Sequence, residues 1–338
     1  MRDVERTRAR HGLRARELTR GIARRSWWLV ALPLLAFSCD SDDRATPLPP
    51  ADAPAVEIAL ADAVVMIGAG DIAMCNSRGD EATAAIVDSI LREDTAAKVK
   101  DVVVTMGDNA YTVGSANQFA RCFGPSWGSK RIMQAIRPSP GNHDYDTRDA
   151  IPYFNYFGDR AGPRGKGYYS YDLGDWHILS LNSETIVDRP GTPEPAEQLE
   201  WLREDLKNHG KPCTLAYFHR PLFSSGVHGP TPEVMVLWTF LDEGGVDLIL
   251  NGHDHHYERF LPQTPLGVAD SVKGIEQIIV GTGGGDLRRV NTPLANNSAF
   301  EVHGRFGVLK LTLGDGEYRR AFIDTNGTVW DRGGRRCH

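Results

Sequence analysis

The chain has 338 residues, of which 41% are hydrophobic and 24% charged; this is the composition of a folded globular protein and excludes wholesale disorder. Its formal net charge is -6, but the first 25 residues carry nine arginines against three acidic residues, so the remainder is more acidic than the total suggests. An acidic body argues against nucleic acid as a partner.

The first 39 residues predict an export signal. A basic head leads into the apolar run 27–37, which is too short to cross a bilayer because a spanning helix needs about 20 residues. Arg24 and Arg25 begin a segment that resembles a bacterial twin-arginine motif. Residues 35–39 resemble a lipobox ending at Cys39, which leaves open an ordinary cleaved signal or a lipid anchor on Cys39. We therefore expect an exported protein, periplasmic or on the cell surface.

The segment 40–61 is rich in proline and acidic residues and predicts a disordered tether. We expect a single folded domain over residues 62–332, followed by a C-terminal tail over 333–338. The sequence after the tether contains no internal repeat.

Apart from Cys39, the chain has four cysteines: Cys75, Cys122, Cys213 and Cys337. In an exported protein an even number allows disulfides, and four cysteines can pair in three ways. We favour a bond between Cys75 and Cys122, because each follows a strand that is expected to carry site residues. The alternative is that all four are free thiols.

In the first half of the domain, extended segments alternate with helical ones. Strands are predicted at 63–68, 102–106 and 136–140. Between them, apolar residues at helical spacing predict a helix over 81–92, and a helical patch covers 116–122.

The second half continues the alternation and ends in strands. The predicted elements are a hairpin over 167–181, a helix over 196–208, a strand over 214–218, a helix over 232–242, a buried strand over 246–250, and strands at 275–280, 306–313 and 318–324. The whole pattern predicts one α/β domain, a four-layer α/β/β/α sandwich with two mixed β-sheets.

Five of the predicted strands end in short polar motifs. They are Gly70-Asp71, Gly107-Asp108-Asn109, Gly141-Asn142-His143-Asp144, His219-Arg220-Pro221 and Gly252-His253-Asp254-His255. Strand ends on one edge of a sheet converge in space, so we expect these side chains to share a cleft. One Asp or Asn alone would fit a turn residue, but five motifs in order predict a site. Carboxylate, amide and imidazole without cysteine suit Zn, Mn or Fe, and the set is large enough for a pair of ions that hydrolyses phosphate esters.

This ordered set resembles the motifs of the calcineurin-like metallophosphoesterase superfamily, and the resemblance extends over residues 62–330. The superfamily opens with Asp-x-His, whereas Asp71-Ile72-Ala73 lacks the histidine ligand. The segment 107–111 instead matches the Gly-Asp-x-x-Tyr motif of purple acid phosphatases, so Tyr111 would replace the missing ligand. The chain therefore resembles a bacterial, exported member of the purple acid phosphatase-like branch.

The resemblance implies two metal ions bridged by Asp108. Fe(III) would be held by Asp71, Asp108, Tyr111 and His255, because a phenolate ligand needs a strongly charged ion. A divalent Fe, Zn or Mn ion would be held by Asp108, Asn142, His219 and His253. The residues by themselves leave open that Tyr111 only packs as an aromatic side chain.

Two further histidines are implied to face the substrate. His143 would contact the phosphate or protonate the leaving group, and His228 would be a second substrate-facing histidine, with a plain loop histidine as the alternative. His177 and His256 are expected to be non-catalytic.

The implied activity is hydrolysis of phosphomonoesters, by attack of a metal-bound hydroxide on a small phosphorylated substrate. One alternative is a phosphodiesterase that uses the same site on nucleotides or lipid head groups. An alternative from another class is a catalytically inactive metal-binding or adhesion domain, although the intact ligand set counts against it.

Export can be tested by two sets of substitutions. Replacing Arg24 and Arg25 by lysine should trap the precursor inside the cell if the twin-arginine route is used, whereas Cys39→Ser should release the mature domain from membranes if Cys39 is acylated. Fractionation of the cells followed by immunoblotting measures both effects. A Cys39→Ser protein that fractionates like the wild type would leave only the plain signal peptide.

Overall fold

The computed structural model describes residues 63–338. The predicted export signal, Cys39 and the tether lie outside the described residues. Within the described part of the chain, no helix is long and apolar enough to cross a membrane.

The first of two β-sheets has six strands. These are β1 (Val64–Ala69), β2 (Lys100–Met106), β3 (Ile136–Ser139), β11 (Gly307–Gly314), β12 (Glu317–Asp324) and β13 (Val329–Arg336). Their order is β13-β12-β11-β1-β2-β3. Strands β1, β2 and β3 are parallel to one another. The pairs β1–β11, β11–β12 and β12–β13 are antiparallel, so the sheet is mixed.

The second sheet has seven strands and is also mixed. These are β4 (Tyr169–Leu173), β5 (Trp176–Ser180), β6 (Cys213–Tyr217), β7 (Leu248–Asn251), β8 (Tyr257–Gln263), β9 (Ile275–Val280) and β10 (Ser298–Val302). Their order is β10-β8-β9-β7-β6-β5-β4, with β5, β6, β7 and β9 parallel in the middle.

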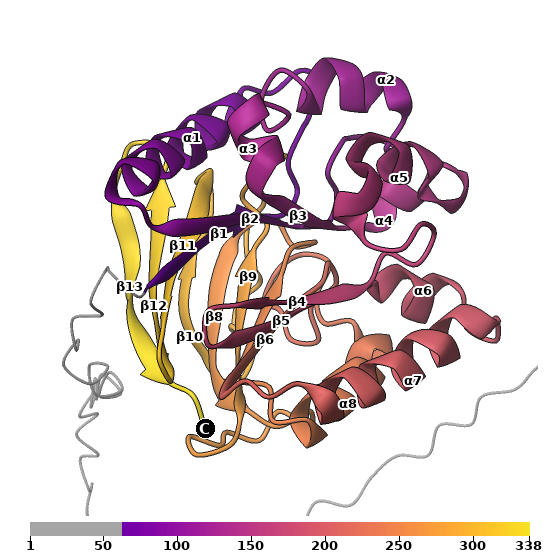
Figure 1. Ribbon diagram of the computed structural model, residues 1–338, viewed down its shortest axis with the longest axis vertical. Coiled ribbons are helices and arrows are strands. Elements are labelled where there is room, and N and C mark those ends of the chain that lie inside the picture. The colour runs from indigo at the N-terminus through magenta and orange to yellow at the C-terminus, as the bar shows by residue number, and fades with distance from the viewer. Residues whose placement is uncertain (1–62) are drawn as a thin grey trace, which may run out of the picture. The chain divides into compact units, whose positions relative to one another are not determined.

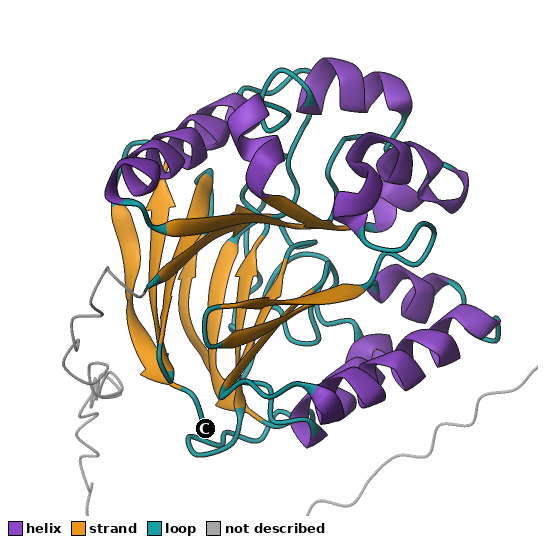
Figure 2. Cartoon of the chain, viewed as in Figure 1, coloured by secondary structure: helices purple, strands orange, loops and turns teal. Residues whose placement is uncertain are grey.

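Helices cover the outer side of each sheet (Figures 1 and 2). Above the first sheet are α1 (Gly79–Ala97), α2 (Ala116–Gln118), α3 (Lys130–Ala135), α4 (Asn142–Tyr145) and α5 (Ile151–Phe157), with the short turns η1 (Phe119–Phe123), η2 (Arg148–Ala150) and η3 (Gly158–Ala161). Below the second are α6 (Ser183–Asp188), α7 (Pro193–Asn208), η4 (Pro232–Val234) and α8 (Met235–Glu243). The predicted four-layer α/β/β/α sandwich with two mixed sheets is confirmed.

Alternation along the central strands divides the core into two parts. On β6, Leu215 and Tyr217 belong to the larger buried cluster, which also extends under α1, whereas Ala216 belongs to the cluster under α7 and α8. On β7, Ile249 likewise packs with Trp238 of α8. Because successive side chains of a strand point to opposite faces, a strand buried on both faces must be apolar at nearly every position. This is why the central strands could be recognised in the sequence as continuous apolar runs.

The structure contains elements that the apolar pattern did not predict. They are the strands β8, β10 and β13 and the short helices α3, α4, α5 and α6. Residues 333–336, which the sequence placed in a C-terminal tail, continue β13. The sequence did not predict this strand because Gly333 and Gly334 contribute no side chains to an alternating apolar pattern.

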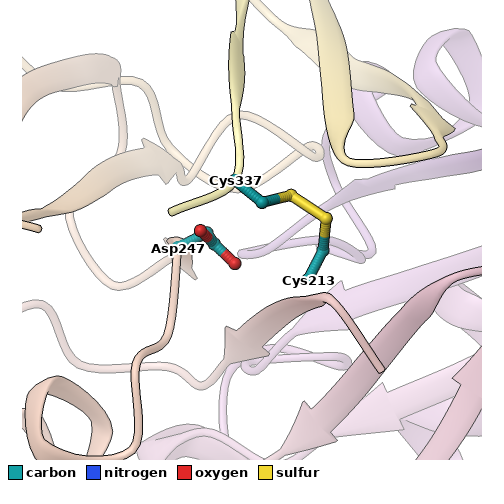
Figure 3. A group of neighbouring side chains, drawn as sticks. All are labelled: Cys213, Asp247 and Cys337. Atoms are coloured by element: carbon teal, nitrogen blue, oxygen red, sulfur yellow. A yellow bond between two sulfur atoms is a disulfide. The ribbon is translucent and has the colours of Figure 1, made fainter. Parts of the chain in front are cut away.

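Both pairs of cysteines are bonded. Cys75 is joined to Cys122, as favoured from the sequence, with 4.7 Å between their Cα atoms. Cys213 at the start of β6 is joined to Cys337, so the chain end after β13 is tied to the second sheet (Figure 3). The nearby Asp247 accepts hydrogen bonds from the backbone N–H groups of Thr214 (2.9 Å) and His338 (2.8 Å). With both sulfurs in a disulfide, this group is a covalent link and not a metal site.

His177 on β5 joins the second sheet to the helix that covers it. Its Nδ1 lies 2.9 Å from an oxygen of Asp172 on β4, and its Nε2 lies 2.6 Å from an oxygen of Asp205 on α7. Burial alone would lower the pKa of the His177 imidazole, but the hydrogen bonds to Asp205 and Asp172 outweigh it and raise the pKa. His177 is near the start of β5, at the opposite end from the polar strand ends, in agreement with a structural role.

We expect His177→Gln to destabilise the domain more at low pH than at high pH. Because the folded-state pKa is raised, the stabilisation is complete below the unfolded pKa of about 6.5 and is lost as the pH rises through the folded pKa. The loss in free energy of unfolding should be about 1 kcal/mol or more at roughly pH 5.5 and smaller near pH 9.

Denaturant unfolding of the wild type and the variant at both pH values measures the difference. His303→Gln serves as the control, because the His303 side chain is 45% exposed and its ion-pair partner within residues 63–338 is Glu301. A loss for His177→Gln that is equal at the two pH values would contradict a charged imidazole.

Candidate metal centre

All five polar motifs meet at the carboxyl ends of β1, β2, β3, β6 and β7, where the edges of the two sheets adjoin. The structure brings together the seven residues that the sequence nominated as ligands: Asp71, Asp108, Tyr111, Asn142, His219, His253 and His255. Ligand atoms of Asp71, Asp108 and His219 lie within 4.8 Å of one another. The convergence of the strand ends expected from the sequence therefore occurs.

Tight turns place these side chains. Asp71, Asp108 and His253 adopt left-handed backbone conformations, with φ of 59°, 50° and 71°. Such values are uncommon outside glycine, and they are tolerated most often by Asp, Asn and His. Gly107, with φ of +78°, precedes Asp108, and a Cβ atom there would lie 2.5 Å from Nδ1 of His219. The turn after β2 can therefore approach the histidine only with glycine at this position.

Each central carboxylate divides its two oxygens between two tasks. Oδ2 of Asp71 accepts a hydrogen bond from the backbone N–H of His253 (2.8 Å), and Oδ1 of Asp108 accepts one from the N–H of His143 (2.8 Å). The remaining oxygens, Oδ1 of Asp71 and Oδ2 of Asp108, face the other ligand atoms. In each carboxylate, one oxygen thus fixes the backbone of a loop that carries a histidine, and the other oxygen faces the candidate ligand atoms.

The ligand atoms form two groups that share one oxygen. In the first group, the phenolic oxygen of Tyr111 lies 2.7 Å from Oδ1 of Asp71, 3.1 Å from Oδ2 of Asp108 and 3.1 Å from Nε2 of His255. In the second, Nε2 of His219 lies 3.3 Å from the same Oδ2 of Asp108, and it also faces the other two ligands: Oδ1 of Asn142 at 3.1 Å and Nδ1 of His253 at 3.3 Å. A single oxygen of Asp108, Oδ2, therefore contacts ligand atoms of both groups.

The donor set fits bound cations. Nδ1 of His219 donates to the carbonyl of Met106 (2.8 Å), and Nδ1 of His255 donates to the carbonyl of Asp286. These bonds fix the tautomers, so that the lone pair of each Nε2 points into the site. There the nitrogens meet carboxylate and amide oxygens and another imidazole nitrogen, a group rich in acceptors. A cation satisfies such a group, and the mix of oxygen and nitrogen without sulfur is that of Fe, Zn or Mn.

Burial shapes the charges of the site. Burial and the nearby Asp108 and Asp71 raise the pKa of the Tyr111 phenol well above its usual range, so its ionisation requires a compensating cation. Burial alone would raise the pKa of Asp108, but His219 and His143 lower it overall. Burial lowers the pKa of His253, which remains a neutral imidazole able to act as a ligand.

Two acidic residues within the motifs accept hydrogen bonds from the segments that carry the candidate ligands and histidines. The sequence analysis did not assign this role to them. The buried Asp144 accepts from the backbone N–H of Gly141 (3.0 Å) and the side-chain amide of Asn109 (2.9 Å). The buried Asp254 accepts from the N–H of His228 (2.9 Å) and the hydroxyl of Ser224 (2.5 Å). The positions of Asp144 and Asp254 inside two of the motifs indicated that they lie near the site. Their hydrogen-bond partners, Asn109 and Ser224, could not be predicted from the spacing of residues in the sequence.

The two predicted substrate-facing histidines each lie beside candidate ligands. His143 has its Nε2 3.9 Å from Oδ2 of Asp108, and its ring centre is 4.8 Å from that of Tyr111. The ring of His228 stacks on His253, with 4.6 Å between ring centres. His256, expected to be non-catalytic, is buried and bonded to Glu258 (3.0 Å).

A cavity of about 370 Å³ opens beside Asn142. Its lining is polar and includes Asp146, Glu184, Asp188, Arg189 and Arg220. Arg220 is paired with the buried Glu184 at 2.8 Å and with Asp188 at 3.3 Å. The cavity thus adjoins the second ligand group, and both acidic and basic side chains line it.

Comparison with known proteins identifies the class to which this fold and site belong. The calcineurin-like phosphoesterase family matches residues 67–257, more than half of the chain. The chain belongs to this family, as the motifs predicted. It is thereby a member of a family of phosphoesterases.

The relatives found by sequence are acid and purple acid phosphatases. Acid phosphatase type 7 of Mus musculus is 30% identical over 201 residues, which cover 51% of this chain and 43% of the relative. Purple acid phosphatase 15 of Arabidopsis thaliana is 27% identical over 201 residues, 47% of this chain and 36% of the relative. The matched region thus spans less than half the length of these relatives.

Solved structures show the same fold at lower sequence identity. The purple acid phosphatase PPD1 from seeds of yellow lupin (Lupinus luteus) superimposes with a TM-score of 0.66 and 22% identity, over 81% of this chain and 54% of that chain. GAP50, the anchor in the inner membrane complex of Plasmodium, superimposes with a TM-score of 0.62 and 14% identity, over 82% and 89% of the two chains. At these identities the likeness concerns the fold.

The close approach at Gly107 can be tested by paired substitutions. Alanine at Gly107 adds both a left-handed backbone penalty, of about 1 kcal/mol, and a clash with the His219 ring. Alanine at Gly165 adds only the penalty, because φ is +82° there and no atom lies within 4 Å of the added Cβ. We expect Gly165→Ala to cost about 1 kcal/mol of stability and Gly107→Ala to cost at least about 1 kcal/mol more and to retain less metal.

Denaturant unfolding and elemental analysis of the two variants beside the wild type measure these effects. Equal losses of stability with unchanged metal content would show that Gly107 serves only the turn and not the approach to His219.

Proposed function

We propose that this chain is a binuclear metal-dependent phosphatase that hydrolyses small phosphomonoesters. Two ions would be bridged by Asp108, with Fe(III) on one side and divalent Fe, Zn or Mn on the other. The Fe(III) ligands would be Asp71, Asp108, Tyr111 and His255. The ligands of the divalent ion would be Asp108, Asn142, His219 and His253. The observation that carries the proposal is the position of Oδ2 of Asp108, 3.1 Å from the Tyr111 oxygen and 3.3 Å from Nε2 of His219.

When bound, such ions supply positive charge that stabilises a phosphoryl-transfer transition state and lowers the pKa of water. The chain's own residues would orient the ester between the two flanking histidines. Nδ1 of His143 donates to the carbonyl of Thr112 (2.6 Å) and lies 3.0 Å from Asp146, which fixes the ring with Nε2 toward the site. From there Nε2 can give a proton to the leaving oxygen or bond to a phosphoryl oxygen.

We further propose that the protein works outside the cytoplasm. Two disulfides, Cys75–Cys122 and Cys213–Cys337, support a protein that works outside the cytoplasm, where disulfides persist. This agrees with the export signal expected from the sequence.

Hydrolysis of an aryl phosphate should exceed hydrolysis of the corresponding bis-aryl diester. Protein purified without chelator is assayed with both esters, and its metal content is determined by elemental analysis, with two ions per chain and at least one iron expected. Full activity with one equivalent of metal or less would overturn the binuclear site. Preference for the diester would favour the phosphodiesterase alternative, and no turnover with two ions bound would favour an inactive metal-binding domain.

Tyr111 distinguishes an iron–tyrosine site from an all-divalent one. Tyr111→Phe removes only the phenolic oxygen, so packing is nearly preserved and the fold should survive. If the phenolate binds Fe(III), the visible charge-transfer band of the wild type should vanish and bound iron should fall. Asp108→Asn should cost more activity than Tyr111→Phe, because its oxygen contacts both groups.

Visible spectra, bound iron and turnover of the two variants are compared with the wild type, and circular dichroism verifies the fold. A colourless wild type with full metal, together with unchanged iron and turnover in Tyr111→Phe, would make Tyr111 a packing residue.

A further inference from the structure

Arg288 lies in a loop that is held against the metal centre at several points. The backbone N–H of Gly285 donates to the carbonyl of Asp71 (2.8 Å), and that of Arg288 donates to the carbonyl of His255 (3.2 Å). Beyond Arg288, the side-chain amide of Asn291 donates to the carbonyl of Gly226 (2.7 Å), two residues before His228. The loop is therefore fixed to both segments that carry histidines on this side of the site.

The guanidinium of Arg288 points to the substrate-facing histidine. Its Nη1 donates to Nε2 of His228, whose ring stacks on His253 with 4.6 Å between ring centres. This contact uses one of the five N–H donors of the guanidinium. The ring of His228 also lies 6.4 Å from that of His255, measured between ring centres, so the guanidinium is held one side chain away from ligands of both groups.

Arg288 differs from the other arginines near the site in its charge balance. Arg220 is paired with Glu184 and Asp188, and Arg189 with Asp149. Among the ion pairs within residues 63–338, none joins Arg288 to a carboxylate. A guanidinium that has no carboxylate partner among these ion pairs and is bonded to a histidine beside the candidate ligands has the charge to bind a phosphoryl group, since guanidinium N–H groups match phosphate oxygens.

We propose that Arg288 is a substrate-binding residue that bonds to the non-bridging oxygens of the phosphoryl group and favours monoesters over diesters. The inference rests on the proposed phosphatase function. A monoester dianion presents more charge and one more free oxygen to the guanidinium than a diester, whose corresponding oxygen carries a second organic group. The leaving group would then lie toward the His143 side and the polar cavity beside Asn142, where the arginines are already paired.

Arg288 lies outside the stretch that matches the family model. Residues matched by the family end at 257, and Arg288 follows the strand β9 that comes after them. Its neighbour Arg289 is exposed, so it provides a control with the same change of charge in the same loop.

The test compares Arg288→Met, Arg288→Lys and Arg289→Met with the wild type, all loaded with metal to the same content. Binding of inorganic phosphate is measured by calorimetry, and kcat and KM are measured for an aryl phosphate and its bis-aryl diester. We expect Arg288→Met to weaken phosphate binding roughly tenfold or more, as for the loss of a charged hydrogen bond, and to raise KM for the monoester more than it lowers kcat. Arg288→Lys should recover part of the affinity, and Arg289→Met should behave like the wild type.

The outcomes separate this inference from the function on which it rests. A wild type that binds phosphate but hydrolyses neither ester would overturn the phosphatase proposal, whereas the calorimetric comparison would still decide the role of Arg288. Phosphate binding that is absent in the wild type, or that is equal in Arg288→Met and Arg289→Met, would overturn the inference. Equal losses of kcat/KM for the monoester and the diester would refute the selectivity assigned to Arg288.

Discussion

The carboxylate of Asp108 uses both of its oxygens, and the rest of the site depends on how they are divided. Oδ1 accepts the N–H of His143 and so places the loop after β3, whereas Oδ2 lies between Tyr111 and His219. The left-handed turn at Asp108 makes this division sterically possible, and Gly107 allows that turn to approach His219. A carboxylate oxygen shared by two ligand groups must be held in a fixed position. A mobile carboxylate would move toward one group and lose its contact with the other.

The two-sheet fold provides the rigidity that this arrangement requires. The ligands come from strands of both sheets, so their distances hold only if the sheets keep a fixed relation. A close-packed apolar cluster contains residues of both sheets, and buried ion pairs add direct links between them. Arg320 of β12 lies 3.3 Å from Glu276 of β9, and Arg259 of β8 lies 2.8 Å from Asp331 of β13. Because one partner left alone would be a buried unpaired charge, these links favour a single registry of the sheets.

The surroundings of the site are asymmetric in charge. On the side of His143, the arginines near Asn142 are balanced by carboxylates, whereas Arg288 on the side of His228 has the imidazole as its bonded partner. Such a gradient would orient a phosphate ester, with its anionic group toward the guanidinium and its organic part toward the polar cavity. The region matched by the family contains all seven candidate ligands and ends before Arg288.

The amino-acid sequence by itself determined the central strands, the layered architecture and the polar motifs at the strand ends, whereas the choice of seven candidate ligands, Tyr111 among them, came from the resemblance to purple acid phosphatases. Continuous apolar runs such as 246–250 are unambiguous because both faces of those strands are buried, and the polar motifs directly follow such runs. The bond between Cys75 and Cys122 was favoured for the same reason, since both follow these strands. Only the tertiary structure decided what Asp144, Asp254 and Arg288 contact, where β13 ends, and which oxygen of Asp108 faces the site. Those features depend on partners far away in the chain, such as Asn109 for Asp144 and His228 for Arg288, and neither propensity nor periodicity records a contact of that kind.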